Sequence, residues 1–275
     1  MGRIPLEDNY NDVLNKAQRG LGLSDEELCR RAGVSMEDLL AVKSGTFNEP
    51  VARRMAGHLR LHRDALVQLA QKRWYPSYAP FTAGFAAFNT TYGDMTVNNY
   101  IIWDERSRHA AVFDTGASAT PVLDLIQAER LTVRSIFLTH GHEDHIADLP
   151  RLAAETGAEV WCSALEPLEF PGLKRFNENA FFHVGAFAIK ALLTSGHSPG
   201  GTTYFVTGLS YPLAIAGDSI FASSMGGAAP EHYVEAIDNN RHKVLTLPAD
   251  TVLACGHGPV TTVVQERRNN PFFLR

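Results

Sequence analysis

The feature that most constrains this chain is a run of metal-binding side chains that follows an apolar segment. His140, His142, Asp144 and His145 lie directly after residues 135–138. If that segment is a buried strand, His140 and His142 lie on one side of it, because alternate side chains of a strand share a side. Asp144 and His145 follow where the chain turns into a helix, so they can address a second point close by. The run therefore predicts ligands for two metals.

The ligand types narrow the choice of metal. Imidazole and carboxylate groups without a thiolate suit zinc, iron or manganese. Cys29, Cys162 and Cys255 are widely scattered and match neither a zinc-finger spacing nor a disulfide framework. We therefore expect two divalent metal ions, with zinc as the first choice and iron or manganese as alternatives, and three cysteines that pack as small apolar residues.

The composition is that of a soluble globular protein. Hydrophobic residues make up 45% of the chain and charged residues 20%, and the net charge is -5. No apolar run is long enough for a transmembrane helix, and the first residues contain no hydrophobic stretch typical of a secretory signal. We expect a cytoplasmic protein that does not contact membranes.

The first part of the chain, residues 1–75, is predicted to be all-helical. Ser24 is expected to cap a helix with Glu27 three residues on, Gly33 to end that helix, and Ser35 to cap the next one. Two further helices are predicted, one beginning near residue 50 and one ending near residue 74. Residues 75–80 contain two prolines and are predicted to be the linker.

The second part of the chain, residues 76–275, mixes strands with helices and predicts an α/β fold. The predicted strands are residues 97–103, 110–113, 135–138, 159–161, 187–193, 203–207, 213–216 and 252–254. Helices are expected at residues 122–128, around 149–154 and at 233–245.

Residues 22–45 resemble the helix-turn-helix of repressor-like bacterial regulators. Basic and acidic side chains are nearly balanced over residues 1–75, and Glu37 and Asp38 stand where such a helix would contact bases. Attraction to phosphates normally supplies most of the nonspecific affinity for DNA. The balance of charge argues against DNA binding and favours a packing module, or a surface through which two copies of the chain associate.

The run at residues 140–145 resembles the HxHxDH signature of the metallo-β-lactamase superfamily, and four other segments resemble further motifs of that family in the same order. Residues 114–116 are similar to its early D-x-G turn, residues 194–200 to its third-histidine loop, residues 216–221 to its bridging-aspartate motif and residues 256–259 to its last-histidine motif. The resemblance implies an αββα sandwich with the site at the ends of the sheets.

The resemblance also implies a role for each motif residue. In the first metal site the ligands would be His140, His142 and His197, and in the second site they would be Asp144, His145 and His257. Asp218 would bridge both metals, and Asp114 would support the ligands without binding metal. No substrate-binding residue can be assigned.

This ligand set predicts a hydrolase in which a metal-bridging hydroxide attacks a carbonyl carbon. Asp144 is the predicted catalytic residue, since it can both ligate metal and accept a hydrogen bond from the attacking water. His142 argues against the redox di-iron members of the family, which carry glutamate there. Asp218 argues against the class B β-lactamases, which lack the bridging aspartate.

The last residues of the chain resemble the ending of short bacterial type II glyoxalases (hydroxyacylglutathione hydrolases). The similarity rests on residues 256–262, on Glu266 and Arg267, and on residues 270–272. It implies hydrolysis of a small-molecule thioester or a related ester. An equally weighted interpretation is that this tail only packs against the fold and carries no information about the substrate.

One departure from the longer glyoxalases concerns glutathione. Those enzymes bind it with a Lys or Arg and with a Tyr, at positions that align with Gly227 and Ala229 here. Neither residue can bind a carboxylate, so the sequence supports the chemistry better than it supports glutathione. The N-terminal helices are a candidate cover for the site.

Three alternatives stay open at this point. A lactonase or a mono-iron persulfide dioxygenase would share the fold, and a DNA-binding regulator would use the metal site as a sensor. Tyr204 and His232 are possible substrate contacts, but a core position and a solvent-exposed position are the simpler interpretations.

Overall fold

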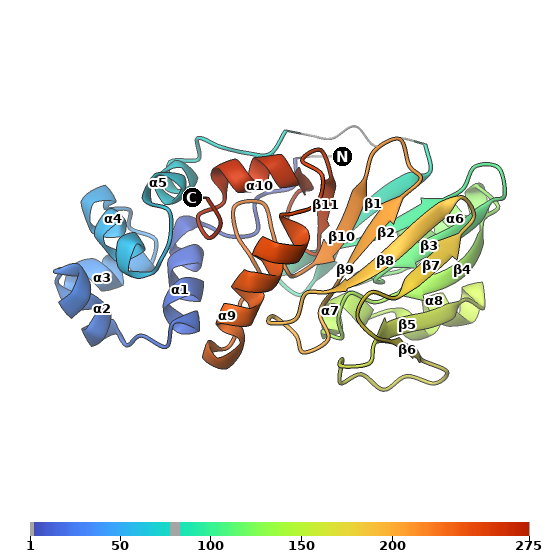
Figure 1. Cartoon of the computed structure of the whole chain (residues 1–275), viewed down its shortest axis with the longest axis horizontal. Helices are drawn as coiled ribbons and strands as arrows, with labels where there is room; N and C mark the ends of the chain where they lie inside the picture. The colour runs from blue at the N-terminus through green and yellow to red at the C-terminus, as the bar shows by residue number, and fades with distance from the viewer. Residues whose placement is uncertain (1–2, 78–82, 275) are drawn as a thin grey trace.

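The computed structural model describes residues 3–77 and 83–274. Its first part is helical, as predicted, and lies at one end of the molecule (Figure 1). The five helices of this part are α1 (Tyr10–Gly20), α2 (Asp25–Ala32), α3 (Met36–Lys43), α4 (Glu49–His58) and α5 (Arg63–Ala70). Within the described residues, none of the helices is long and apolar enough to cross a membrane.

The local signals at α2 and α3 act as expected. Ser24 Oγ accepts a hydrogen bond from the Glu27 amide at 3.2 Å, and Gly33 ends α2 in the left-handed conformation with φ of 61°. Ser35 Oγ accepts from the Asp38 amide at 3.0 Å at the start of α3. The prediction for α5 was too long, because this helix ends at Ala70. Of the predicted linker, residues 78–80 lie outside the described part of the chain.

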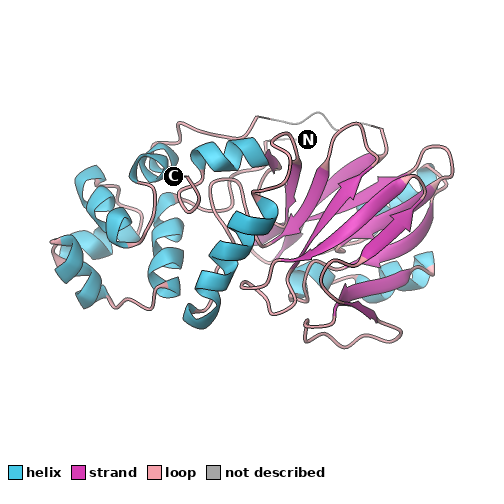
Figure 2. Cartoon of the chain, viewed as in Figure 1, coloured by secondary structure: helices cyan, strands magenta, loops and turns pink. Residues whose placement is uncertain are grey.

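Two six-stranded sheets pack face to face in the second part (Figure 2). The first sheet is ordered β1-β2-β3-β4-β5-β6, with β1 (Phe85–Tyr92), β2 (Met95–Trp103), β3 (His109–Phe113), β4 (Thr132–Phe137), β5 (Glu159–Ser163) and β6 (Lys174–Phe176). The second is ordered β12-β11-β10-β9-β8-β7, with β7 (Phe181–Val184), β8 (Phe187–Leu193), β9 (Thr202–Thr207), β10 (Leu213–Gly217), β11 (Val252–Cys255) and β12 (Thr261–Thr262). Strands β1, β6, β7 and β12 were not predicted.

Side chains that alternate along a strand face two different cores, and this alternation produces the layers of the fold. Ala111 and Phe113 of β3 face the core between the sheets, whereas Ala110 and Val112 face an outer core. That outer core also contains residues of α6 (Thr120–Ala128) and α8 (Leu149–Thr156). The other sheet is covered by α9 (Pro230–Asn239), a π-helical turn at Asn240–Val244 and α10 (Val263–Asn269). The order of layers is αββα, as the sequence predicts.

Helix α1 joins the N-terminal helices to this outer layer. Its buried residues Val13, Leu14 and Ala17 belong to the same apolar cluster as Ala214 and Leu253 of the second sheet. Figure 1 shows α1 beside α9. The two parts of the chain therefore share one continuous core.

A glycine sets the closeness of α1 and α9, and it supports a stability prediction. A Cβ atom on Gly20 would lie 2.2 Å from Cδ2 and 2.4 Å from Cγ of the buried Tyr233 ring, too close for both groups to keep their places. We expect Gly20→Ala to lower the free energy of unfolding by about 1–3 kcal/mol, as overpacking does. Urea unfolding followed by circular dichroism measures this.

Gly57 of α4 provides the matched control. A Cβ there would meet only the end of the flexible Arg63 side chain, 2.5 Å from Nη2. Because alanine is also the better helix former, Gly57→Ala should leave the stability unchanged or raise it by up to about 1 kcal/mol. Equal effects of the two substitutions would contradict the close packing of α1 on α9.

Candidate metal centre

The seven predicted ligands gather at one end of the two sheets, although they come from four separate segments. His140, His142, Asp144 and His145 follow β4 and enter α7 (Glu143–Ile146), the short helix expected there. His197 lies between β8 and β9, Asp218 directly follows β10, and His257 follows β11. We refer to these seven residues as the ligand cluster. The ends of adjacent strands bring them together, as is common for sites in α/β proteins.

Three imidazoles form the first group of the ligand cluster. His142 Nδ1 lies 3.0 Å from His140 Nε2 and 3.0 Å from His197 Nε2. The three nitrogens are within 4.8 Å of one another, which is the spacing of ligands that can hold one ion.

Asp144, His145 and His257 form the second group. Asp144 Oδ2 lies 3.2 Å from His257 Nε2 and 3.6 Å from His145 Nε2. Asp218 reaches residues of both groups: Oδ1 is 3.3 Å from His145 Nε2, and Oδ2 is 3.4 Å from His197 Nε2 and 3.5 Å from His257 Nε2. Its carboxylate thus occupies the position expected of a bridge.

Buried polar atoms without partners indicate that the ligand cluster fits metal ions. His145 Nε2 and Asp218 Oδ1 are buried, and among the described residues neither has a hydrogen-bond partner. Buried polar atoms are rarely left unsatisfied without a reason, and a role in coordinating an ion is one such reason. Five imidazoles and two carboxylates suit zinc or iron. The His/Asp cluster therefore fits a dinuclear metal site whose metal is not specified by the geometry.

Oxygen acceptors orient three of the imidazoles. His145 Nδ1 donates to Asp114 Oδ2 at 2.8 Å, His197 Nδ1 to the Gly227 carbonyl at 2.8 Å, and His257 Nδ1 to the Thr96 carbonyl at 2.7 Å. In each ring the other nitrogen is then left free for a metal.

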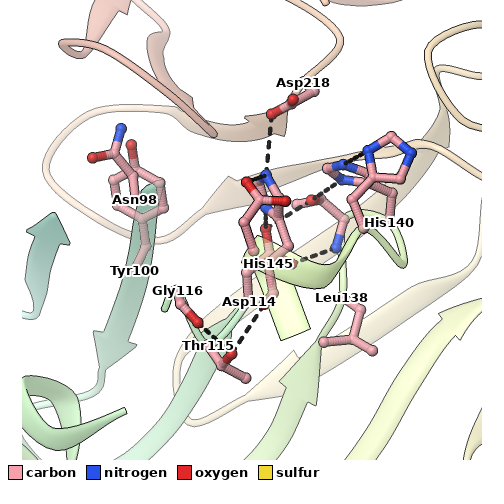
Figure 3. Close-up of polar contacts among 12 residues, drawn as sticks. Asn98, Tyr100, Asp114, Thr115, Gly116, Leu138, His140, His145 and Asp218 are labelled. Atoms are coloured by element: carbon pink, nitrogen blue, oxygen red, sulfur yellow. Dashed lines mark hydrogen bonds and ion pairs between the residues drawn. The ribbon is translucent and has the colours of Figure 1, made fainter. Parts of the chain in front are cut away.

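Asp114 holds two parts of the site together. Its Oδ1 accepts from the Thr139 amide and its Oδ2 from the Thr139 hydroxyl, both at 2.7 Å, in addition to the bond from His145. Figure 3 shows His145 between Asp114 and Asp218. Asp114 has a positive φ of 56°, which a short polar residue tolerates better than most. Asp114 therefore contacts both the ring of His145 and Thr139, the residue before His140.

The electrostatics of the ligand cluster without metal are uneven. Burial opposes the charged form of His145, but the carboxylates of Asp218 and Asp114 outweigh it and raise its pKa well above the ordinary value. Burial also opposes charge on His257, yet the hydrogen bond to Asp144 and the charge of Asp218 raise its pKa to about 9. Burial lowers the pKa of His140 well below its usual range. Metal binding must therefore displace protons from the second group.

Glu166 is a buried residue of the site that the sequence analysis missed. Its Oε1 accepts from the Gly141 amide at 2.9 Å, and its Oε2 accepts from the Gly200 amide at 2.8 Å and from the Ser198 hydroxyl. It therefore ties the loop of His140 and His142 to the loop of His197. No local motif surrounds Glu166, so no sequence signal pointed to it.

The weaker candidates have clear positions. Tyr204 is fully buried between the sheets and donates to the Leu138 carbonyl at 2.7 Å, so it is a core residue. Cys255 is buried in β11. His232 is half exposed and, with Leu165 and Pro199, lines a cavity of about 260 Å³ that also borders His197.

The tail of the chain packs against the fold. Asn270 Nδ2 donates to the Ser224 carbonyl at 2.8 Å, and Arg267 Nε donates to the Leu245 carbonyl at 2.7 Å. Glu266, which is fully buried, accepts from the Ser223 amide at 2.9 Å. The contacts of Asn270 and Glu266 hold the segment that follows Asp218, and the contact of Arg267 holds the end of the π-helical turn, so the tail has a structural function.

Comparison with known proteins gives the class. The family model of the metallo-β-lactamase superfamily matches residues 92–257, and the chain belongs to this superfamily. The hydroxyacylglutathione hydrolase GloC of Haemophilus influenzae is 28% identical over 64% of this chain and 92% of its own length. The probable metallo-hydrolase YqgX of Bacillus subtilis is 29% identical over 66% of this chain and 93% of its own.

Solved structures agree with the fold. The BLEG-1 B3 metallo-β-lactamase has a TM-score of 0.58 at 26% identity and covers 69% of this chain and 100% of its own. The di-iron-bound form of TTHA1623 has a TM-score of 0.54 at 25% identity, over 67% of this chain and 99% of its own. ETHE1 from Myxococcus xanthus, with a TM-score of 0.57 at 22% identity over 68% of this chain and 83% of its own, shares the fold.

Proposed function

We propose that this protein is a dinuclear metal-dependent hydrolase that acts on a thioester. The observation that carries the proposal is the position of Asp218, whose two oxygens reach imidazoles of both groups of the ligand cluster. The relatives named hydroxyacylglutathione hydrolase support the thioester.

Each residue of the ligand cluster has a role in this proposal. The first metal would be held by His140, His142 and His197, the second by Asp144, His145 and His257, and Asp218 would bridge them. Two divalent ions held by these residues would supply a water of lowered pKa and would polarise the substrate carbonyl. Asp114 keeps His145 in the tautomer whose Nε2 is available to bind a metal.

We assign to Asp144 the role of accepting the proton of the attacking water. It is the more exposed of the two clustered carboxylates, with 13% of its side chain accessible against 9% for Asp218. Its Oδ2 can accept a hydrogen bond from water while His257 holds the carboxylate in place. A thiolate leaves more readily than an alkoxide because a thiol has a pKa of about 8.5, so the departing sulfur needs little help from an acid.

We place the acyl group of the substrate in the cavity beside His197. Leu165, Pro199 and Ala229 give it an apolar wall, and His232 and Glu235 a polar one. At about 260 Å³ it accommodates a small acyl group rather than a bulky one.

Turnover measurements on metal-replete protein test this function. A panel of thioesters, lactones and phosphodiesters should show hydrolysis of thioesters first, with about two metal ions per chain, and His142→Ala should abolish the activity. Failure to hydrolyse any ester-like substrate would overturn the proposal. One iron per chain together with oxygen consumption would favour the dioxygenase alternative.

A further inference from the structure

Residues 224–227 form a short segment with the ligand cluster on one side and α1 on the other. Toward the cluster, the Gly226 amide donates to the Asp218 carbonyl at 3.0 Å, and the Gly227 carbonyl accepts from His197 Nδ1 at 2.8 Å. Toward α1, the Met225 carbonyl accepts from Lys16 Nζ at 3.0 Å. Only residues 224–227 therefore lie between this part of helix α1 and the ligand cluster.

The guanidinium of Arg19 lies directly on Gly227. A Cβ atom on this glycine would be 2.3 Å from Arg19 Nη2 and 3.5 Å from Arg19 Cζ. The cation therefore occupies the space that any side chain at position 227 would need. A residue of the N-terminal helices supplies a positive charge beside a loop that has none of its own.

Of the three neighbouring cations Lys16, Arg19 and Lys43, Arg19 is the one that has no acidic partner among the described residues. Lys16 is paired with Asp8, and Lys43 is paired with Asp25 at 2.6 Å. Asp12 Oδ2 accepts from the Asn9 amide at the start of α1. Arg19 is exposed, and its guanidinium is free to bind an anion.

The surface around Arg19 is concave. Arg19, Lys16, Asp12 and Asp8 contribute to the lining of a cavity of about 530 Å³. Asp25 and Lys43 also line the cavity, so its acidic and basic side chains are equal in number, and Arg19 is the basic one that forms no ion pair with a described residue.

The N-terminal segment before α1 is fixed against the same end of the site. A Cβ on Gly258, which follows His257, would lie 3.0 Å from the Glu7 amide nitrogen. Asp8 accepts a hydrogen bond from the Ser224 hydroxyl. Helix α1, and Arg19 with it, therefore has a defined position relative to the ligand cluster.

We propose that Arg19 binds a carboxylate on the thiol portion of the substrate, so that the N-terminal helices form part of the substrate site. This rests on the proposed thioester hydrolysis, and it narrows the substrate to thioesters of a carboxylate-bearing thiol long enough to pass over residues 224–227. A guanidinium offers two parallel N–H donors that match a carboxylate.

Equilibrium binding without turnover tests the role of Arg19 in the metal-replete full-length protein. Glutathione, a thiol with two carboxylates, is titrated calorimetrically, and its dimethyl ester serves as the analogue without carboxylates. In Arg19→Ala the dissociation constant for glutathione should rise about tenfold, as expected for the loss of a charged hydrogen-bond partner, and binding of the ester should not change. Arg54→Ala is the control, since Arg54 is exposed on α4 far along the chain from Gly227.

A second variant displaces Arg19 without removing its charge. Gly227→Ala places a methyl group where Nη2 lies, so it should weaken glutathione binding as Arg19→Ala does. The double variant should bind no more weakly than either single one, because both remove the same contact.

Steady-state kinetics of the same variants separate this inference from the proposed function. The substrates are S-lactoylglutathione and its dimethyl ester. Arg19→Ala should raise KM for S-lactoylglutathione about tenfold, leave its kcat unchanged and leave turnover of the dimethyl ester unaffected. If glutathione binds to Arg19→Ala as to wild type, or if wild type does not distinguish glutathione from the ester, the role of Arg19 is refuted. Loss of all thioester turnover in wild type would instead refute the proposed function.

Discussion

Replacing Asp218 with asparagine is expected to lower hydrolysis by more than about a hundredfold and to reduce the bound metal below two ions per chain. Asparagine keeps the shape of the side chain but removes the negative charge that lies within 3.5 Å of three imidazoles. Loss of a residue that only orients a ligand already costs roughly 10- to 100-fold, so loss of the bridge should cost more. Metal content by mass spectrometry and initial rates on a thioester measure the two effects.

Asp250→Asn is the matched control for that substitution. Asp250 is exposed and lies outside the ligand cluster, so this variant should keep the full metal content and rate. If Asp218→Asn retained two metals and normal turnover, the bridging role would be wrong, and the site would have to be redrawn with one metal.

Removing the Glu266 side chain should produce the largest loss of stability. This carboxyl is fully buried and accepts from the Thr261 hydroxyl at 2.7 Å, the Ser223 amide at 2.9 Å and Asn270 Nδ2 at 2.8 Å. In Glu266→Ala three buried donors lose their acceptor, and we expect the free energy of unfolding to fall by about 3–5 kcal/mol. Chemical denaturation measures it, and Glu105→Ala, at an exposed turn, should have almost no effect.

The pH dependence of stability gives a second signature of Glu266. Burial raises the pKa of this carboxyl from 4.5 to about 7, although its hydrogen bonds to Thr261, Asn270 and the Ser223 amide lower it. Between these two values the folded protein holds a proton that the unfolded chain has released. The stabilising contribution is therefore complete below pH 4.5 and is lost as the pH rises through 7. Glu266→Gln should lack this decline, and an equally steep decline in the variant would refute the assignment.

The ligand cluster could be predicted from the sequence because its chemistry is local. His140 to His145 stand in one run, and Asp218 and His257 each lie in a short motif at the end of a strand. Glu166 could not be predicted in this way. Its function depends on two amide groups and a hydroxyl from loops far away in the chain, and only the folded structure brings these together.

Helix α1 and strand β1 were not predicted from the sequence, for different physical reasons. Helix α1 carries Tyr10, Val13, Leu14 and Ala17 at helical spacing, so its periodicity was available and was overlooked. Strand β1 is only half buried along most of its length and therefore lacks the apolar pattern of a core strand. The C-terminal tail was similar to that of a thioesterase family, yet its side chains turned out to brace the fold around residues 221–224.

The core that α1 shares with α9 bears on the ancestry of the chain. Val13, Leu14 and Ala17 belong to the same buried cluster as Tyr233 and Ala236 of α9, the helix that α1 packs against. A lineage that lost the N-terminal helices would expose this side of α9 to water and would need polar replacements there. The helices therefore cannot be exchanged between proteins as an independent unit without matching changes on the helix that they contact.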